Sequence, residues 1–272
     1  MCALSVVLAA GAQTPGPAAQ AVAATAAGDA ALGARLLERA FRNLYADDYI
    51  QTLVLADGRR GGRERRRELQ IIRKQSQRPG KALVRFTAPA SIRRTSVLVL
   101  ENEGASDDLY VYLPAIRRTK HLSSAQRADS FFGTDLSYED VEPKRAADFE
   151  AVAVGAGSAG EIACTRVVAT PRPDYVSAYE RMELCIEPER GIPLWIDFHS
   201  GGKVAKRLSV DPASVRAVGD AWIPFEMTME RTATATRMST RSYELRPEIP
   251  DTLFNTWNLE AGDDKRDRAR ID

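Results

Sequence analysis

The chain has 272 residues, of which 44% are hydrophobic and 28% charged, an ordinary composition for a globular protein of one large domain or two small ones. Its 38 lysines and arginines almost balance its 37 acidic residues, so net charge gives no support for a nucleic-acid-binding protein. Beyond the first residues, no segment is apolar for long enough to form a transmembrane helix.

The first 28 residues differ in composition from the rest. Residues 1–13 are an apolar run with the length of a signal-peptide core, and residues 19–21 and 21–23 both fit the small-x-small cleavage rule. The positive charges that usually precede such a run are absent, so a disordered Ala-rich N-terminus is the alternative. We expect residues 1–28 to be a signal peptide with an Ala/Pro-rich segment, and the protein to be secreted.

One amphipathic helix is predicted at residues 29–45. Asp29 is a suitable N-cap, and apolar residues then recur at helical spacing, at Leu32, Leu36, Leu37, Ala40, Phe41 and Leu44. This apolar stripe must cover another surface of the protein.

From residue 48 onward the pattern is that of strands. Residues 48–56 and 64–74 flank glycine-rich turns and predict a β-hairpin. The arginine run at residues 59–67 predicts a solvated hairpin tip and an outward strand face, with a patch for a membrane or an acidic partner as the alternative. Further strands are expected at residues 81–87, 95–101, 109–113, 147–154, 161–170, 178–187, 193–199, 203–210, 216–231 and 233–245.

These strands are joined by connections too short for parallel crossovers, so the sheet is predicted to be antiparallel. About ten or eleven such strands form either a sandwich or a curled barrel, and the N-terminal helix could plug the concave face of a curled sheet. We expect a single β domain at residues 29–260, followed by a charged, disordered tail at residues 261–272.

No motif supports catalysis, a metal or a cofactor. Residues 155–160 match GxGxxG, but an alternating strand follows where a dinucleotide site needs a helix, so we expect a flexible hairpin loop. The two histidines, His121 and His199, have no partner at metal-ligand spacing. The carboxylates of Asp135, Glu139 and Asp140 have no nucleophile beside them, and a turn cap or a contact to Arg117 or Arg118 explains them equally well. We therefore predict that the protein is not an enzyme.

Two cysteines, Cys164 and Cys185, remain once the predicted leader is removed. Each lies in a predicted strand, and an even pair in a secreted chain could form one disulfide if the strands are neighbours. Two separate buried thiols are the alternative.

The least generic stretch runs from residue 107 to residue 140. It contains LYVYLP at 109–114, an arginine pair, and DSFFGTDLSYED at 129–140. This pattern resembles that of the periplasmic outer-membrane lipoprotein-sorting protein family, the LolA-like group, over residues 29–260. The residues that carry the resemblance, and to which we give a structural role, are Pro114, Arg117, Arg118, Gly133, Asp135, Tyr138 and Asp140.

The resemblance implies an incompletely closed antiparallel barrel whose mouth is covered by helices and whose apolar hollow holds acyl chains. It implies a periplasmic carrier that moves lipoproteins or lipids toward the outer membrane, with an inner-membrane exporter of the RND or MMPL type and an outer-membrane acceptor as partners. The alternative is an accessory subunit that docks on such an exporter and carries nothing. The residues predicted to line the hollow, each of which plain core packing would also explain, are Leu36, Leu37, Phe41, Leu98, Leu100, Tyr110, Tyr112, Phe131, Phe132, Trp195 and Trp222.

Overall fold

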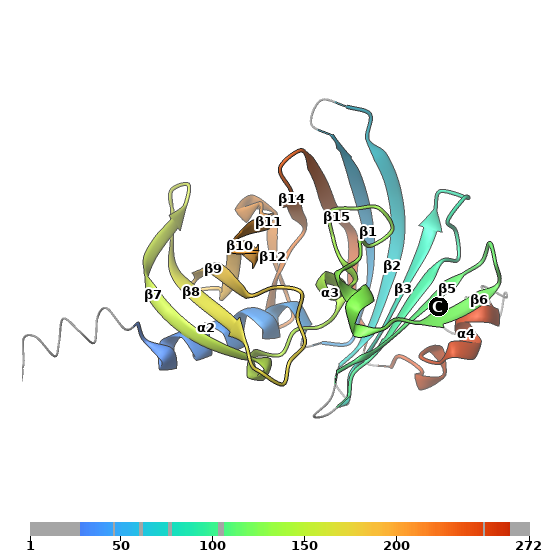
Figure 1. The fold of residues 1–272 in the computed structure, drawn as a ribbon, viewed down its shortest axis with the longest axis horizontal. Coiled ribbons are helices and arrows are strands. Elements are labelled where there is room, and N and C mark those ends of the chain that lie inside the picture. Colours follow the sequence, from blue (N-terminus) through green and yellow to red (C-terminus); the bar gives the residue numbers. More distant parts are fainter. Residues whose placement is uncertain are drawn as a thin grey trace, which may run out of the picture.

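The structure, a computed structural model, describes residues 28–45, 47–59, 62–75, 78–102, 106–246 and 248–261. The predicted leader and tail lie almost entirely outside these residues. Within them, thirteen strands form one antiparallel sheet in the order β6-β5-β4-β3-β2-β1-β15-β14-β11-β10-β9-β8-β7 (Figure 1). Because β6 and β7 stand at the two ends and do not pair with each other, the sheet is curved but not closed, which confirms the predicted fold class.

The strands of the sheet follow the chain almost in order. They are β1 (Tyr49–Arg59), β2 (Arg65–Lys74), β3 (Lys81–Ala88), β4 (Ser96–Leu100), β5 (Asp108–Leu113), β6 (Arg118–His121), β7 (Phe149–Ala159), β8 (Ile162–Pro171), β9 (Arg181–Glu187), β10 (Ile192–Ser200), β11 (Lys203–Val210), β14 (Glu226–Glu230) and β15 (Thr234–Leu245). A separate two-stranded hairpin consists of β12 (Val215–Val218) and β13 (Ala221–Pro224).

The predicted helix is present as α2 (Ala30–Tyr45). Asp29 caps it, since its Oδ1 accepts a hydrogen bond from the Leu32 amide at 2.8 Å. The helix packs across β7 to β10 and β13 on the concave side of the sheet. Gly33 lies so close to β7 that a Cβ atom there would be 2.6 Å from the Ala153 nitrogen, so this position needs glycine.

The C-terminal half of α2 is hydrogen-bonded to the turn between β9 and β10. Arg39 donates to the Pro188 carbonyl at 2.8 Å, and Asn43 donates to the Gly191 carbonyl at 3.0 Å. Polar side chains therefore fix the orientation of a helix whose apolar stripe supplies most of the buried surface.

Two further segments cover the half of the sheet formed by β1 to β6 (Figure 1). The concave cover, residues 124–148, contains the 3-10 helices η1 (Ser124–Ala128) and η2 (Ala146–Asp148) and the one-turn helix α3 (Tyr138–Val141). The convex cover, residues 249–261, contains η4 (Asp251–Leu253) and α4 (Thr256–Ala261). The central strands of this half, β3 and β4, are thus buried on both faces.

Three local predictions were wrong. Residues 216–231 are not one strand but parts of β12, β13 and β14, because Gly219 takes a positive φ of 59° and starts a two-residue turn. Residues 155–160 are not a loop, since β7 continues to Ala159 with a bulge between Ala153 and Gly155. Strand β6 was missed, because a charged four-residue edge strand has no apolar alternation.

Cys164 on β8 and Cys185 on β9 form a disulfide bond with a sulfur–sulfur distance of 1.92 Å. Both side chains are buried on the outer face of the sheet, against Leu194. The bond links neighbouring strands close to the β7 edge.

Candidate functional site

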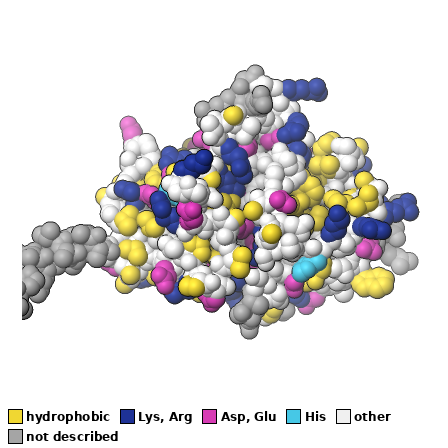
Figure 2. Space-filling view, viewed as in Figure 1, with side chains coloured by type: hydrophobic (Ala, Val, Ile, Leu, Met, Phe, Trp, Pro, Cys, Tyr) yellow, Lys and Arg dark blue, Asp and Glu magenta, His cyan; other side chains and the backbone are white. Residues whose placement is uncertain are grey.

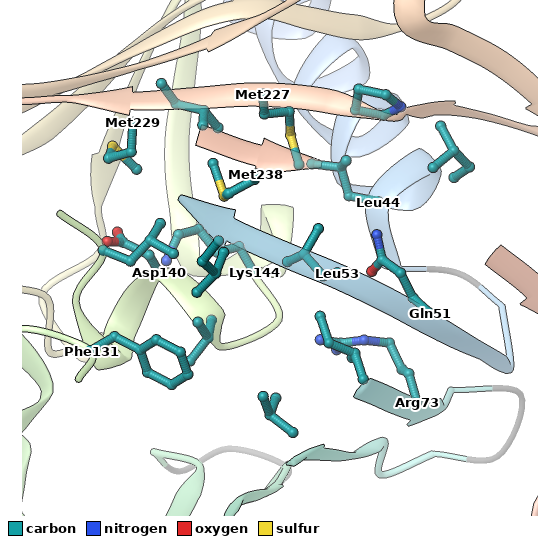
Figure 3. A pocket seen from close by; sticks show the side chains of 18 of the residues that line it. Leu44, Gln51, Leu53, Arg73, Phe131, Asp140, Lys144, Met227, Met229 and Met238 are labelled. Atoms are coloured by element: carbon teal, nitrogen blue, oxygen red, sulfur yellow. The ribbon is translucent and has the colours of Figure 1, made fainter. Parts of the chain in front are cut away.

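An apolar hollow lies inside the curved sheet, where its two halves face each other. Its volume is about 180 Å³, whereas packed protein interiors contain few voids larger than one water molecule. Inward residues of six strands form much of its wall, mostly with long and flexible side chains: Leu53, Leu55, Leu69, Ile71, Met182, Ile196, Phe198, Met227, Met229 and Met238. Figure 3 shows Met227, Met229 and Met238 around this space, opposite Leu53 and Phe131.

Methionine suits such a wall because its unbranched thioether chain fills irregular spaces and adapts to different apolar partners. Four of the wall residues are methionines, on β9, β14 and β15. The wall can therefore accept apolar ligands of more than one shape.

One end of the hollow is polar. Gln51 on β1 donates to the Thr240 hydroxyl at 2.7 Å, and Arg73 on β2 donates to the Tyr49 hydroxyl at 3.1 Å. The Tyr49 ring stacks on Tyr243 with 4.5 Å between the ring centres.

The opposite end holds a buried ion pair between Asp140 of α3 and Lys206 of β11. Their side chains are 3% and 1% exposed. Asp140 also accepts hydrogen bonds from the Tyr179 hydroxyl at 2.8 Å and the Ser137 amide at 2.6 Å. Burial acts to raise the pKa of Asp140, but the ammonium groups of Lys206 and Lys144 and these hydrogen bonds outweigh it, so the pKa lies below its usual range.

Behind this pair, the concave cover buries a second carboxylate, Glu142. Burial raises the pKa of Glu142 to about 7, against the opposing effect of the Arg127 guanidinium 3.3 Å away. Neighbouring Glu139 is fixed by the Ala178 amide at 2.8 Å and by the Ser177 hydroxyl. The Asp140–Lys206 pair thus links the concave cover to the sheet, whereas Arg127 and Glu142 link two parts of the cover itself and Glu139 is bound by the loop before β9.

Of the eleven residues predicted to line the hollow, two do so: Phe41 of α2 and Phe131 of the concave cover. Leu36 and Leu37 are buried in the packed core under α2. Phe132 packs edge-on against Phe86 of β3, beside the hollow rather than within its wall.

Four of the others lie on the wrong side of the sheet for the hollow. Leu98, Leu100, Tyr110 and Tyr112 face the convex side and pack under the convex cover. Their neighbours Val97, Val99, Leu109 and Val111 face the concave core instead. A strand buried on both faces has no polar alternation to indicate its orientation, which explains the wrong assignment.

The two predicted tryptophans also lie outside the hollow. Trp195 packs on the outer face beside the disulfide, under the Arg207 guanidinium. Trp222 of β13 is half-buried, with the Arg190 guanidinium over its ring.

The signature residues divide between two places. Gly133, Asp135, Tyr138 and Asp140 belong to the concave cover, where Phe132 and Gly133 take consecutive positive φ values of 50° and 78° and turn the chain back on itself. Phe131 and Phe132 both contact Phe86. Tyr138 packs edge-on against both phenylalanines, so the motif seats the cover on β3.

Of the two explanations for the signature carboxylates, the contact to Arg117 or Arg118 was wrong, whereas Asp140 does act as a cap, accepting from the Ser137 amide. Pro114, Arg117 and Arg118 lie at the β5–β6 turn, where both arginines are exposed. Asp135 instead accepts from the Thr236 hydroxyl at 2.8 Å, and Asp140 pairs with Lys206. These partners lie 101 and 66 positions away in the sequence, so reasoning from neighbouring residues does not find them.

Sequence reasoning missed the methionine wall. Its signal was available, since Met227, Met229 and Met238 alternate with polar residues at the spacing of strand faces. The error in the 216–231 segment concealed it.

Two further observations concern chemistry and membranes. Among the residues that the structure describes, no group of three or more His, Cys, Asp or Glu side chains is placed to hold a metal ion. None of the described helices is long and apolar enough to cross a membrane.

Three solved structures share this architecture over most of their length. A DUF1329 family protein from Desulfovibrio piger is 22% identical, with a TM-score of 0.79, and the match covers 85% of this chain and 99% of that one. An outer membrane lipoprotein-sorting protein domain from Vibrio parahaemolyticus gives 20% identity and a TM-score of 0.77, over 85% and 100% of the two chains. A LolA superfamily protein from Nitrosomonas europaea is 19% identical with a TM-score of 0.66, and the match covers 83% of this chain and 99% of that one.

The fold is therefore that of the LolA-like proteins, as the signature stretch predicted. A family model described as that of an uncharacterized protein matches residues 79–261, more than half of the chain, and the protein belongs to this DUF1329-like family. No curated protein matches the sequence.

Proposed function

We propose that the protein is a carrier that binds the acyl chains of lipoproteins or lipids in the hollow and moves them through the periplasm toward the outer membrane. The observation that carries the proposal is the apolar, methionine-lined hollow inside an open sheet. Each methylene group transferred from water into such a space contributes about 0.8 kcal/mol, so several methylene groups of an acyl chain stabilise binding without covalent chemistry. The solved lipoprotein-sorting domain with the same fold supports this choice.

Location and partners follow from the same proposal. The Cys164–Cys185 disulfide favours an oxidising compartment such as the periplasm, since cytosolic thiols are kept reduced. An inner-membrane exporter of the RND or MMPL type would deliver the cargo, and an outer-membrane acceptor would receive it.

The test is whether acyl chains bind in the hollow. The purified protein is extracted with organic solvent and its lipids are measured by mass spectrometry, for the wild type and for Met227→Trp. Met227 is half-buried in the wall, so an indole at this position fills the hollow without displacing the core. We expect about tenfold less lipid in this variant, because the space for several methylene groups is lost.

The matched control is Thr228→Trp, the next residue on β14, which faces the other side of the strand. It should leave lipid binding unchanged. Equal lipid content in all three proteins, or no lipid in any of them, would contradict the carrier function and leave the accessory subunit without cargo as the better description.

A further inference from the structure

A second groove lies at the rim of the sheet, beside the tip of the β1–β2 hairpin. It has a volume of about 1280 Å³ and is lined by five arginines and four carboxylates: Arg63, Arg65, Arg66, Arg67 and Arg231, with Asp57, Glu64, Asp129 and Asp135. Figure 2 shows some lysine and arginine side chains near this end of the molecule, among others spread over the same face. We call it the rim groove.

The sequence predicted that the arginine run lies on a solvated hairpin tip and an outward strand face. This prediction fails for two of the arginines. Arg65 and Arg67 turn to the concave side, where both bind the carboxylate of Asp57. Asp57 is only 3% exposed, and Arg65 reaches it at 2.6 Å. Two guanidinium groups on one carboxylate leave a net positive charge at this point of the groove.

Two of the other three carboxylates, Asp135 and Glu64, are also engaged. The Asp135 oxygens accept from the hydroxyls of Thr234 and Thr236. Glu64 pairs with Arg237, a sixth arginine, at 2.8 Å. These acids therefore stabilise the walls of the groove, while the guanidinium groups remain in excess.

Several arginine donors are available to a ligand. Arg63 is exposed, and its side chain makes no hydrogen bond or ion pair with the described part of the chain. Arg231 lies 3.9 Å from the Asp135 carboxylate, at the limit of an ion pair. The planar guanidinium fork matches the oxygens of a phosphate group and binds them by charge-assisted hydrogen bonds.

The rim groove is continuous with the hollow along three strands. Residues two positions apart share a strand face, and the lining passes from Leu55 to Asp57 on β1 and from Leu69 to Arg67 on β2. On β15 it passes from Met238 in the hollow to Thr234 in the groove. One face of the sheet thus changes from apolar to cationic over a short distance.

The signature loop spans the same boundary. Phe131 lines the hollow, whereas Gly133 and Asp135 line the rim groove. The Gly133 carbonyl accepts from Arg65 at 3.2 Å, which connects the loop to the arginine cluster. A ligand with an apolar part in the hollow would carry its polar end to these arginines.

We propose that the rim groove binds an anionic headgroup of the phosphate class, carried by an amphiphile whose acyl chains occupy the hollow. This proposal rests on the proposed function, because it takes the hollow to be the acyl-chain site. It adds a substrate class: cargo with a phosphate-bearing headgroup is preferred over cargo whose headgroup is uncharged.

The experiment measures binding by calorimetry at about 0.1 M salt, where exposed charges farther apart than about 10 Å are screened. The probes are dihexanoylphosphatidylglycerol, dihexanoylglycerol and inorganic phosphate. The proteins are the wild type, Arg63→Gln/Arg65→Gln, and the control Arg117→Gln/Arg118→Gln, which removes the same charge at the exposed β5–β6 turn. Asp57 keeps Arg67 as its partner in the first variant, so the melting temperature should change little.

We expect the wild type and the control to bind the anionic lipid about tenfold more tightly than the uncharged one, the effect of one or two charge-assisted hydrogen bonds. The Arg63→Gln/Arg65→Gln variant should bind both lipids with the affinity that the wild type has for the uncharged one. Equal affinity of the wild type for both lipids would overturn the headgroup proposal and leave the acyl-chain site standing. Phosphate alone binding as tightly as the anionic lipid would overturn it in favour of a free-anion site, and binding of neither lipid would overturn the carrier function itself.

Discussion

The two covers of the β1–β6 half of the sheet are built from different chemistry. The convex cover inserts Ile249, Leu253, Phe254 and Leu259 into apolar residues of β1 to β5, and charged groups contact it only at its surface, where Lys74 and Lys81 reach Asp251. The concave cover also packs aromatic rings on the sheet, but it contains buried charged groups as well: Asp140 pairs with Lys206 of β11, and Arg127 pairs with Glu142 inside the cover. One cover is packed throughout, and the other leaves a hollow beside it.

This difference in chemistry suggests different roles for the two covers. Apolar packing is not directional and fills space, so it suits a surface that only has to be closed. Buried ion pairs act at a few points and depend on pH, and between those points the chain can span a space without filling it. We infer that the convex cover mainly stabilises the fold and that the concave cover shapes the ligand site.

The largest expected effect tests the convex cover. Phe254→Ala should lower the free energy of unfolding by about 3–5 kcal/mol, since Phe254 is buried and its removal leaves a cavity. Urea denaturation measures this loss, and lipid content should remain at the wild-type level. A variant that keeps its stability but loses its lipid would show that the convex cover belongs to the binding site.

The next largest effect is the pH dependence of stability, which tests the buried carboxylate Glu142 of the concave cover. Because burial raises the pKa of Glu142 from 4.5 to about 7, its contribution to stability is fully present below pH 4.5 and is lost as the pH rises through about 7. The loss amounts to about 3 kcal/mol. Unfolding followed between pH 4 and 8 should therefore show a slope that Glu142→Gln removes.

Two controls define this test. Glu150→Gln changes a carboxylate that is 66% exposed and should leave the slope unchanged. Phe254→Ala should lower stability equally at every pH. A slope that persists in Glu142→Gln would mean that another group of the concave cover titrates in its place.

The smallest effect tests the wall of the hollow. Met238→Ala should cost only about 1–2 kcal/mol, below the usual cost of a buried methionine, because one side of this chain faces the hollow and has few packing partners. Leu83→Ala on β3, which is fully buried under the convex cover, should cost about 2–5 kcal/mol. If chemical denaturation gives equal losses, the wall is packed as tightly as an ordinary core.

The sequence predicted those parts of the fold that local patterns determine. Helix α2 has one apolar stripe and a capping aspartate, and most strands lie between evident turn residues, so both were found. The signature stretch also identified the LolA-like fold. The Gly219 turn was missed because the residues on both sides continue a strand pattern.

The site was less predictable because it depends on which face of each strand is inside. Leu98 and Val99 are both apolar and both fully buried, yet they lie on opposite sides of the sheet. Only the position of the convex cover, about 150 residues later in the chain, distinguishes the two faces. The Asp140–Lys206 pair has the same origin, since sheet order and not sequence distance brings β11 to α3.

The open sheet leaves two strand edges, and such edges can template the addition of strands from other copies of the chain. Edge strand β6 has only four residues, among them Arg118, Lys120 and His121, so like charges would meet across any edge-to-edge pairing. The other edge is partly occupied, because the backbone of Asp29 exchanges two hydrogen bonds of 2.9 Å with Ala153 of β7. Both features oppose edge-to-edge pairing, so the sheet can remain unclosed without promoting aggregation.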